Sequence, residues 1–131
     1  MLSYFIVMPG GALGTGARFW ASGFVARRFG EAFPFGTLVV NVTGSFVIGF
    51  FATLSDLDGV LLVRPTFRQF FMIGVCGGYT TFSSFSLQTP TLARDGEWLW
   101  AGGNTVLSVV LCLIAVWLGH AAAEWLNKMK G

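Results

Sequence analysis

The residues best suited to chemistry gather in one segment, residues 77–86, with the sequence GGYTTFSSFS. Two adjacent glycines and five serine and threonine hydroxyls stand there inside an otherwise apolar run. In hydrocarbon every backbone N–H and C=O needs a partner, so a membrane helix breaks only where it is buried in protein or lines a cavity. The segment therefore predicts an ion site at membrane depth. The alternative is a kinked helix that packs through its small residues.

Two aromatic residues of this segment, Phe82 and Phe85, are three positions apart and share a face if the segment is helical. Such a pair most often serves plain packing. However, the edge of an aromatic ring is electropositive and can meet an anion. Because the hydroxyls of Thr81, Ser83 and Ser84 are interleaved with the two rings, edge-on contact with an anion is a reasonable hypothesis.

Polar residues also form two stripes with helical i, i+4, i+8 spacing, one in each of two further apolar segments. They are Thr37, Asn41 and Ser45 in the first segment, and Asn104, Ser108 and Cys112 in the second. Either stripe can be explained as hydrogen-bonding between packed helices. Together with the interrupted segment, the stripes favour a conduction path. Asn41 is the best single candidate because its amide can donate two hydrogen bonds to an anion.

Charged residues are almost absent from the apolar segments. Arg18 is the exception away from the segment ends, and it either snorkels to an interface or attracts anions to a vestibule. The lone His120, near the end of the last apolar segment, is expected to be interfacial. No Asp or Glu lies in a segment core, which argues against a proton-coupled exporter of cations. No nucleophile–base pair, phosphate loop or metal-ligand cluster occurs in the sequence, so we expect no enzyme.

The elements that must position these residues follow from composition. Of 131 residues, 54% are hydrophobic and 11% are charged, whereas soluble domains carry about 25% charged residues. We therefore predict an all-α integral membrane protein with one domain, residues 1–131, and four spans at about 4–25, 36–55, 68–93 and 98–125. The third span is predicted to be broken near Gly77–Thr80. The net charge of +2 is too small and too scattered to indicate nucleic-acid binding, and Cys76 and Cys112 are expected to be buried free thiols.

The positive charges are nearly balanced between the two sides of the membrane. With four spans, one side carries Arg64, Arg68, Lys128 and Lys130, and the other carries Arg27, Arg28 and Arg94. Lys and Arg bias normally sets orientation, so a chain with four against three can insert either way up. Four short helices rarely enclose a polar path alone, and two oppositely oriented copies could pair. The alternative is an orientation fixed by features other than charge.

Three motifs give the chain a family resemblance over essentially its whole length. Residues 10–18 read GGALGTGAR, residues 36–44 read GTLVVNVTG, and residues 74–86 read GVCGGYTTFSSFS. On these motifs the chain resembles the small bacterial fluoride channels of the Fluc (CrcB) family, and the third motif is very specific to that family. The resemblance implies an antiparallel, dual-topology homodimer in the bacterial plasma (inner) membrane. Such a dimer would conduct fluoride passively through two pores.

The resemblance also implies roles for individual residues. Phe82 and Phe85 would turn ring edges to fluoride, Asn41 would be a polar pore ligand, and Arg18 would lie in an aqueous vestibule. Backbone carbonyls of Gly77 and Thr80 would hold a structural sodium ion, Na+, at the two-fold axis. The predicted anion pathway comprises Phe82, Phe85, Asn41, Thr37, Thr81, Ser83, Ser84, Ser108, Asn104 and Arg18.

The chain departs from the family pattern at three positions. Gln88 stands where many relatives have Glu, Asn104 where a Tyr or another polar residue is usual, and Cys112 where Ser is frequent. The polar track of the fourth span is therefore the less secure part of the prediction. Two other functions stay open at this point: a small multidrug/proton antiporter-like dimer, and a non-transporting membrane assembly subunit.

Overall fold

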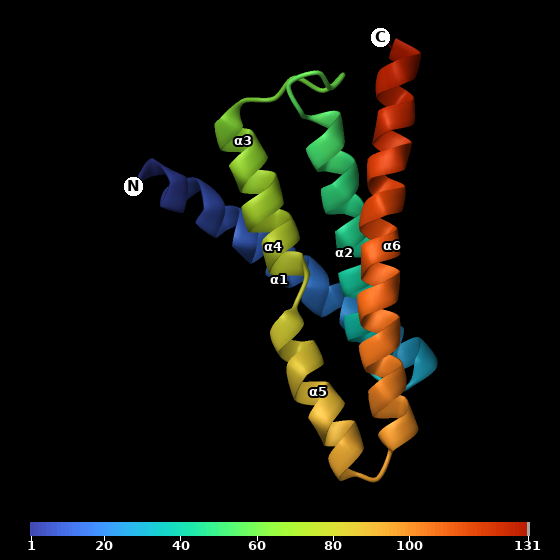
Figure 1. Cartoon of the computed structure of the whole chain (residues 1–131). Coiled ribbons are helices and arrows are strands. Elements are labelled where there is room, and N and C mark those ends of the chain that lie inside the picture. Colours follow the sequence, from blue (N-terminus) through green and yellow to red (C-terminus); the bar gives the residue numbers. More distant parts are fainter. Residues whose placement is uncertain (131) are drawn as a thin grey trace.

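The computed structural model describes residues 1–130, and its regular elements in that range are all helices (Figure 1). They are α1 Leu2–Phe29, α2 Phe35–Leu54, α3 Pro65–Gln69, the π-helix η1 Phe70–Cys76, α4 Gly77–Tyr79, α5 Phe82–Arg94 and α6 Trp98–Lys130. The elements α3, η1 and α4 follow one another without a gap. Together with α5 they make the interrupted third helix that the sequence predicts.

Three of the four predicted spans are long and apolar enough to cross a membrane. They are Phe35–Leu54, Pro65–Arg94 and Trp98–Lys130. The first predicted span lies within α1, a helix of 28 residues that is not among these three. Five glycines and three arginines within α1 lower its mean hydropathy. The chain is thus all-helical as expected over the described residues, and α1 satisfies the length of a span but not its apolarity.

Helices α2 and α6 lie side by side along most of the length of α2 (Figure 1). Glycines allow this close approach, because a Cβ on Gly49 would lie 3.1 Å from the carbonyl carbon of Val116, and a Cβ on Gly119 would lie 2.8 Å from the amide nitrogen of Phe50. The buried face of α6 is built from small residues, which is typical of helix packing in membranes.

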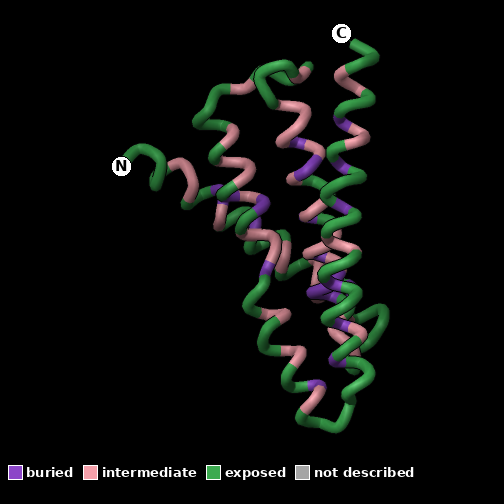
Figure 2. The backbone as a smooth tube through the Cα atoms, in the orientation of Figure 1, coloured by how far each residue is buried: buried purple, intermediate pink, exposed green. Residues whose placement is uncertain are grey.

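Helix α1 crosses the η1–α4 segment at a steep angle and also meets α2 (Figure 1). Glycines again form the crossing: a Cβ on Gly78 would lie 2.6 Å from the carbonyl oxygen of Gly11, and a Cβ on Gly10 would lie 3.1 Å from Cα of Gly74. Figure 2 shows that buried residues gather at this crossing and along the α2–α6 pair, whereas the N-terminal residues of α1 and the last residues of α6 are exposed. The fold therefore fixes α4, the segment that precedes the break, between α1 and α2.

Candidate ion pathway

The third helix is interrupted by two extended residues, Thr80 and Thr81, which we call the break. Their φ and ψ angles are −84° and 157° for Thr80, and −151° and 110° for Thr81. Gly77 and Gly78 themselves are helical. The break thus lies at the downstream edge of the predicted range Gly77–Thr80. Gly78 is needed for contact with α1 and so serves packing rather than unwinding, whereas a Cβ on Gly77 would meet only the carbonyl oxygen of Met72, at 3.8 Å.

Asn41 of α2 holds the break from the side. Its Nδ2 donates to the carbonyl of Thr81 at 3.0 Å, and its Oδ1 accepts from the amide of Thr81 at 2.7 Å. One side chain therefore satisfies both the backbone N–H and the backbone C=O of the extended residue Thr81, as the interior of a membrane protein requires. Only one of the two Nδ2 hydrogens is used by this pair.

The side chain of Thr81 caps the N-terminus of α5. Its Oγ1 accepts from the amide of Ser84 at 3.2 Å, which makes Thr81 the N-cap residue of the helix. The same oxygen lies 3.1 Å from the hydroxyls of both Ser83 and Ser84. The predicted hydroxyl residues are thus brought together at the first turn of α5.

Two backbone carbonyls lose their helical donors, because the amides that would bond them have other partners. In an unbroken helix the Gly77 carbonyl would accept from the amide of Thr81, and the Thr80 carbonyl would accept from the amide of Ser84. Instead, Thr81 N–H donates to Asn41 and Ser84 N–H donates to Thr81 Oγ1. The hydroxyl of Thr80 donates to the Cys76 carbonyl at 3.1 Å. Gly77 and Thr80, the two residues predicted to hold a cation through their carbonyls, are therefore among the residues at the break whose carbonyls lose helical donors.

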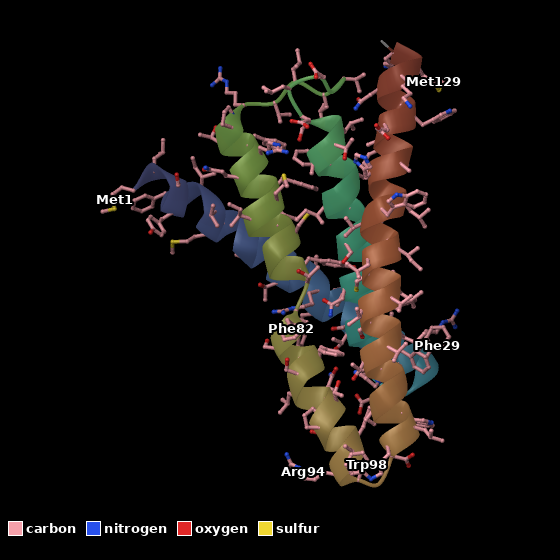
Figure 3. All side chains as sticks on the ribbon, viewed as in Figure 1. Met1, Phe29, Phe82, Arg94, Trp98 and Met129 are labelled. Carbon is pink, nitrogen blue, oxygen red and sulfur yellow. The ribbon has the colours of Figure 1, made fainter. Side chains whose placement is uncertain are left out.

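A cavity of about 420 Å³ opens beside the break, and we call it the central cavity. It is lined by Asn41, Gly44, Ser45, Ile48, Cys76, Gly77, Thr80, Thr81, Phe82, Phe85, Ser108, Val109, Cys112 and Leu113. The ring centroids of Phe82 and Phe85 are 5.4 Å apart with the planes tilted by 44°. Phe82 lies at the first turn of α5 and is 77% exposed on the single chain (Figure 3).

A second, smaller space of about 230 Å³ lies on the α1 side of the break, and we call it the arginine pocket. It is lined by Thr15, Arg18, Phe19, Ser22, Thr37, Val40, Thr81 and Ser84. One cationic side chain thus faces several hydroxyls, a lining suited to an anion. Thr81 lines both this pocket and the central cavity, so the break separates the two.

The polar stripe of α6 divides between two roles. Asn104 is 2% exposed and donates to Thr89 Oγ1 at 2.9 Å, which joins α6 to α5. Asn104 does not line the central cavity, whereas Ser108 and Cys112 do. Asn104 thus makes a hydrogen bond between packed helices, the alternative that the spacing left open, and its place in the anion pathway stays a prediction. Both cysteines are free, as expected; Cys76 is buried and Cys112 is half-buried.

Some residues near the break had no place in the sequence-based prediction. Thr15 and Ser22 join Arg18 in the arginine pocket, and their spacing of three and four residues from Arg18 was the available signal. Tyr79 and Thr43 pair through their hydroxyls, which no spacing rule indicates. Conversely, Ser83 is exposed and lines neither of the two cavities.

Comparison with known proteins places this chain in a family. The model of the family described as "CrcB-like protein, Camphor Resistance (CrcB)" matches residues 5–120. The chain belongs to this CrcB-like family. Proteins named "Fluoride-specific ion channel FluC" are similar over nearly their whole length, and three of them illustrate the likeness.

The three similar proteins come from different bacteria. The one from Opitutus terrae is 63% identical over 131 residues, which is 100% of this chain and 99% of that protein. The one from Rhodospirillum rubrum is 59% identical over 97% of this chain and 98% of its own length. The one from Methylocella silvestris is 57% identical over 99% of each. This CrcB-like chain is accordingly a multi-pass membrane protein.

The site of this CrcB-like chain offers only certain kinds of ligand. Among residues 1–130 there is no group of three or more His, Cys, Asp or Glu side chains that could hold a metal ion. The break supplies carbonyl, hydroxyl and amide oxygens instead, which suit a hard cation rather than a transition metal.

Proposed function

We propose that this chain is a fluoride-selective channel that lets the anion leave the cell passively and so lowers cytoplasmic fluoride. The substrate comes from the similar proteins, which are named fluoride-specific ion channels. The observation that carries the proposal is the break, where Asn41, Phe82 and Phe85 line one cavity at a membrane helix interruption. A channel, unlike an enzyme, needs no reacting groups there.

The pathway would run from the arginine pocket past the break to the central cavity. Arg18 would raise the local concentration of anions at the entrance. Beyond Thr81, the free Nδ2 hydrogen of Asn41 and the electropositive ring edges of Phe82 and Phe85 would replace part of the hydration shell of fluoride. Thr37 and Ser84 line the entrance, and Ser108 lines the central cavity, as polar groups along this route.

A sodium ion fits the carbonyls that the break frees. Gly77 and Thr80 line the same cavity, and their carbonyls lack the helical donors they would otherwise have. A two-fold axis would double these two oxygens to four. When bound, the cation would neutralise partly negative oxygens that otherwise repel one another in a low-dielectric interior. We propose it as a structural ion that is not transported.

Two copies in opposite orientations would complete the channel. Helix α1 would serve as the first of four spans, with Gly10 and Gly14 packed on the third helix and Arg18 facing the arginine pocket. Phe82 is largely exposed on the single chain and Gly77 is exposed, although both line the central cavity. A second copy would enclose these residues, and the near balance of Lys and Arg is compatible with insertion of both orientations in the bacterial plasma membrane.

The experiment is ion efflux from liposomes that contain the purified protein. Fluoride and chloride release are followed with ion-selective electrodes, with and without an imposed pH gradient. The proposal predicts rapid fluoride efflux down its gradient at equal pH, and far slower chloride efflux. Efflux only when a proton gradient is imposed would indicate an antiporter, and no efflux above protein-free liposomes would indicate a non-transporting subunit.

A further inference from the structure

A hydrogen bond joins α2 to the residue that precedes the break. The hydroxyl of Tyr79 lies 2.9 Å from Oγ1 of Thr43. Thr43 Oγ1 is in turn 2.8 Å from the carbonyl of Val39, one turn earlier in α2. The phenol of Tyr79 is therefore tied to a side chain that is itself tied to its own helix.

Gly44, the next residue of α2, packs closely against Tyr79 and Thr80. A Cβ on Gly44 would overlap Cγ2 of Thr80 and lie 3.0 Å from Cδ1 of Tyr79. The Thr80 methyl cannot rotate away freely, because the Thr80 hydroxyl is bonded to the Cys76 carbonyl. Glycine at position 44 thus makes room for both residues on the upstream side of the break.

Thr43 and Gly44 together form what we call the α2 seat, and the segment they hold carries the Thr80 carbonyl. Asn41 fixes the downstream residue, Thr81, but leaves Tyr79 and Thr80 to other contacts. We propose that the α2 seat positions the Thr80 carbonyl and thereby sets the affinity of the break for its cation. This inference rests on the sodium site of the proposed function and assigns the α2 seat a positioning role in it.

The test is a sodium titration of thermal stability. The whole protein in detergent is exchanged into N-methyl-D-glucamine with a sodium-binding cryptand, and Tm is measured as sodium is restored. A bound ion stabilises the folded protein by RT ln(1 + [Na+]/Kd), so Tm begins to rise near the Kd and continues to rise above it. Fitting this relation gives the sodium concentration at half-occupancy, which we call the sodium midpoint. Fluoride efflux is measured over the same sodium concentrations.

Three variants weaken the α2 seat to different degrees. Thr43→Val and Tyr79→Phe each remove one hydrogen bond between helices and should raise the sodium midpoint about three-fold. Gly44→Ala should raise it roughly ten-fold or more, because the new methyl displaces Thr80. Thr43→Ser keeps the hydroxyl and should restore the wild-type midpoint. If Gly44→Ala does not fold, the two milder variants decide the question.

The matched control is Thr53→Val at the far end of the same helix. Thr53 Oγ1 lies 2.7 Å from Nδ1 of His120 on α6, so this variant also loses a hydroxyl contact with a neighbouring helix. It should lower Tm at every sodium concentration while leaving the midpoint unchanged. An equal shift of the midpoint in Thr53→Val would reduce the α2 seat to general stability and overturn the inference.

Failure of the inference and failure of the proposed cation site give different results. A sodium-dependent wild type whose midpoint is unchanged in all three variants overturns the α2 seat alone. A wild type whose Tm and efflux ignore sodium overturns the cation site, and this inference with it. A fluoride channel without sodium dependence would still satisfy the rest of the proposed function.

Discussion

The side chain of Asn41 hydrogen-bonds both the backbone N–H and the backbone C=O of Thr81, and Thr81 is only 7% exposed. Without the amide, a buried N–H and a buried C=O would lose their partners, at a cost of about 1–3 kcal/mol for each group. The same side chain lines the central cavity. At the scale of single residues, the group that stabilises the break is therefore also one of its candidate ligands for an anion.

The aromatic pair gives a prediction that separates contact with an ion from packing. Phe82→Ile and Phe85→Ile should each reduce fluoride efflux at least ten-fold, because an aliphatic side chain offers no electropositive edge. Gel-filtration behaviour should stay that of the wild type, because isoleucine keeps an apolar side chain at both positions. The measurement is efflux from liposomes at matched protein content.

Phe24→Ile is the control for this pair. Phe24 is 46% exposed, stacks on Trp20 and lines neither the central cavity nor the arginine pocket. Its efflux should match the wild type. Undiminished efflux in both cavity variants would remove the rings from the mechanism.

Residue types and spacing were enough to single out Asn41, the hydroxyls of the break and the two rings. Their partners were not predictable, because the bond from Asn41 joins residues 40 positions apart in the sequence. The role of Asn104 was open for the same reason: one spacing fits a pore-lining stripe and a contact with Thr89 on α5 equally well. Chemistry can be read from local sequence, but partner choice depends on how helices pack.

At the scale of elements, helix α4 is confined between α1 and α2 before the chain unwinds at Thr80. Gly78 faces the α1 backbone, so this crossing depends on the absence of a side chain. We expect Gly78→Ala to destabilise the protein by about 1–3 kcal/mol through overpacking. The measurement is thermal unfolding in detergent.

Gly102→Ala supplies the comparison within α6. A Cβ at Gly102 would meet nothing within 4 Å. Replacing a helical glycine in open space should stabilise the protein by about 0.4–1 kcal/mol. Equal losses in the two variants would contradict the account of the α1 crossing.

The existence of a broken third helix was predictable from Gly77, Gly78 and the hydroxyls that follow. Its location was less so, because both glycines suit unwinding and close packing equally. At Gly78 the tertiary contact with α1 decides for packing, and the extended residues fall on Thr80 and Thr81. The π-helical turn Phe70–Cys76 upstream carries no sequence signal that we can identify.

At the scale of the whole molecule, Lys and Arg are split four against three across the predicted sides. Such a balance predicts insertion in both orientations. A cysteine tag at either terminus, in a Cys76→Ser, Cys112→Ser background, should be labelled from both sides of the membrane in comparable amounts. Labelling from one side alone would contradict dual topology and the antiparallel pair.

Adding charge to one side extends this test. Leu57→Lys and Leu62→Lys place two cations in the exposed 55–64 connection, on the side of both termini. The labelled fraction should shift strongly toward one orientation, and fluoride efflux should fall because oppositely oriented partners become scarce.

The most direct test of the account compares fluoride efflux in the wild type, Asn41→Ala and Val42→Ala. Val42→Ala trims the adjacent residue of α2 without removing a hydrogen bond to the break, so it controls for packing. We predict that Asn41→Ala loses at least ten-fold in fluoride efflux while Val42→Ala stays within about two-fold of the wild type, since two buried backbone groups lose their partners only in the former. Wild-type efflux in Asn41→Ala would contradict the claim that the break held by Asn41 is the route of the anion.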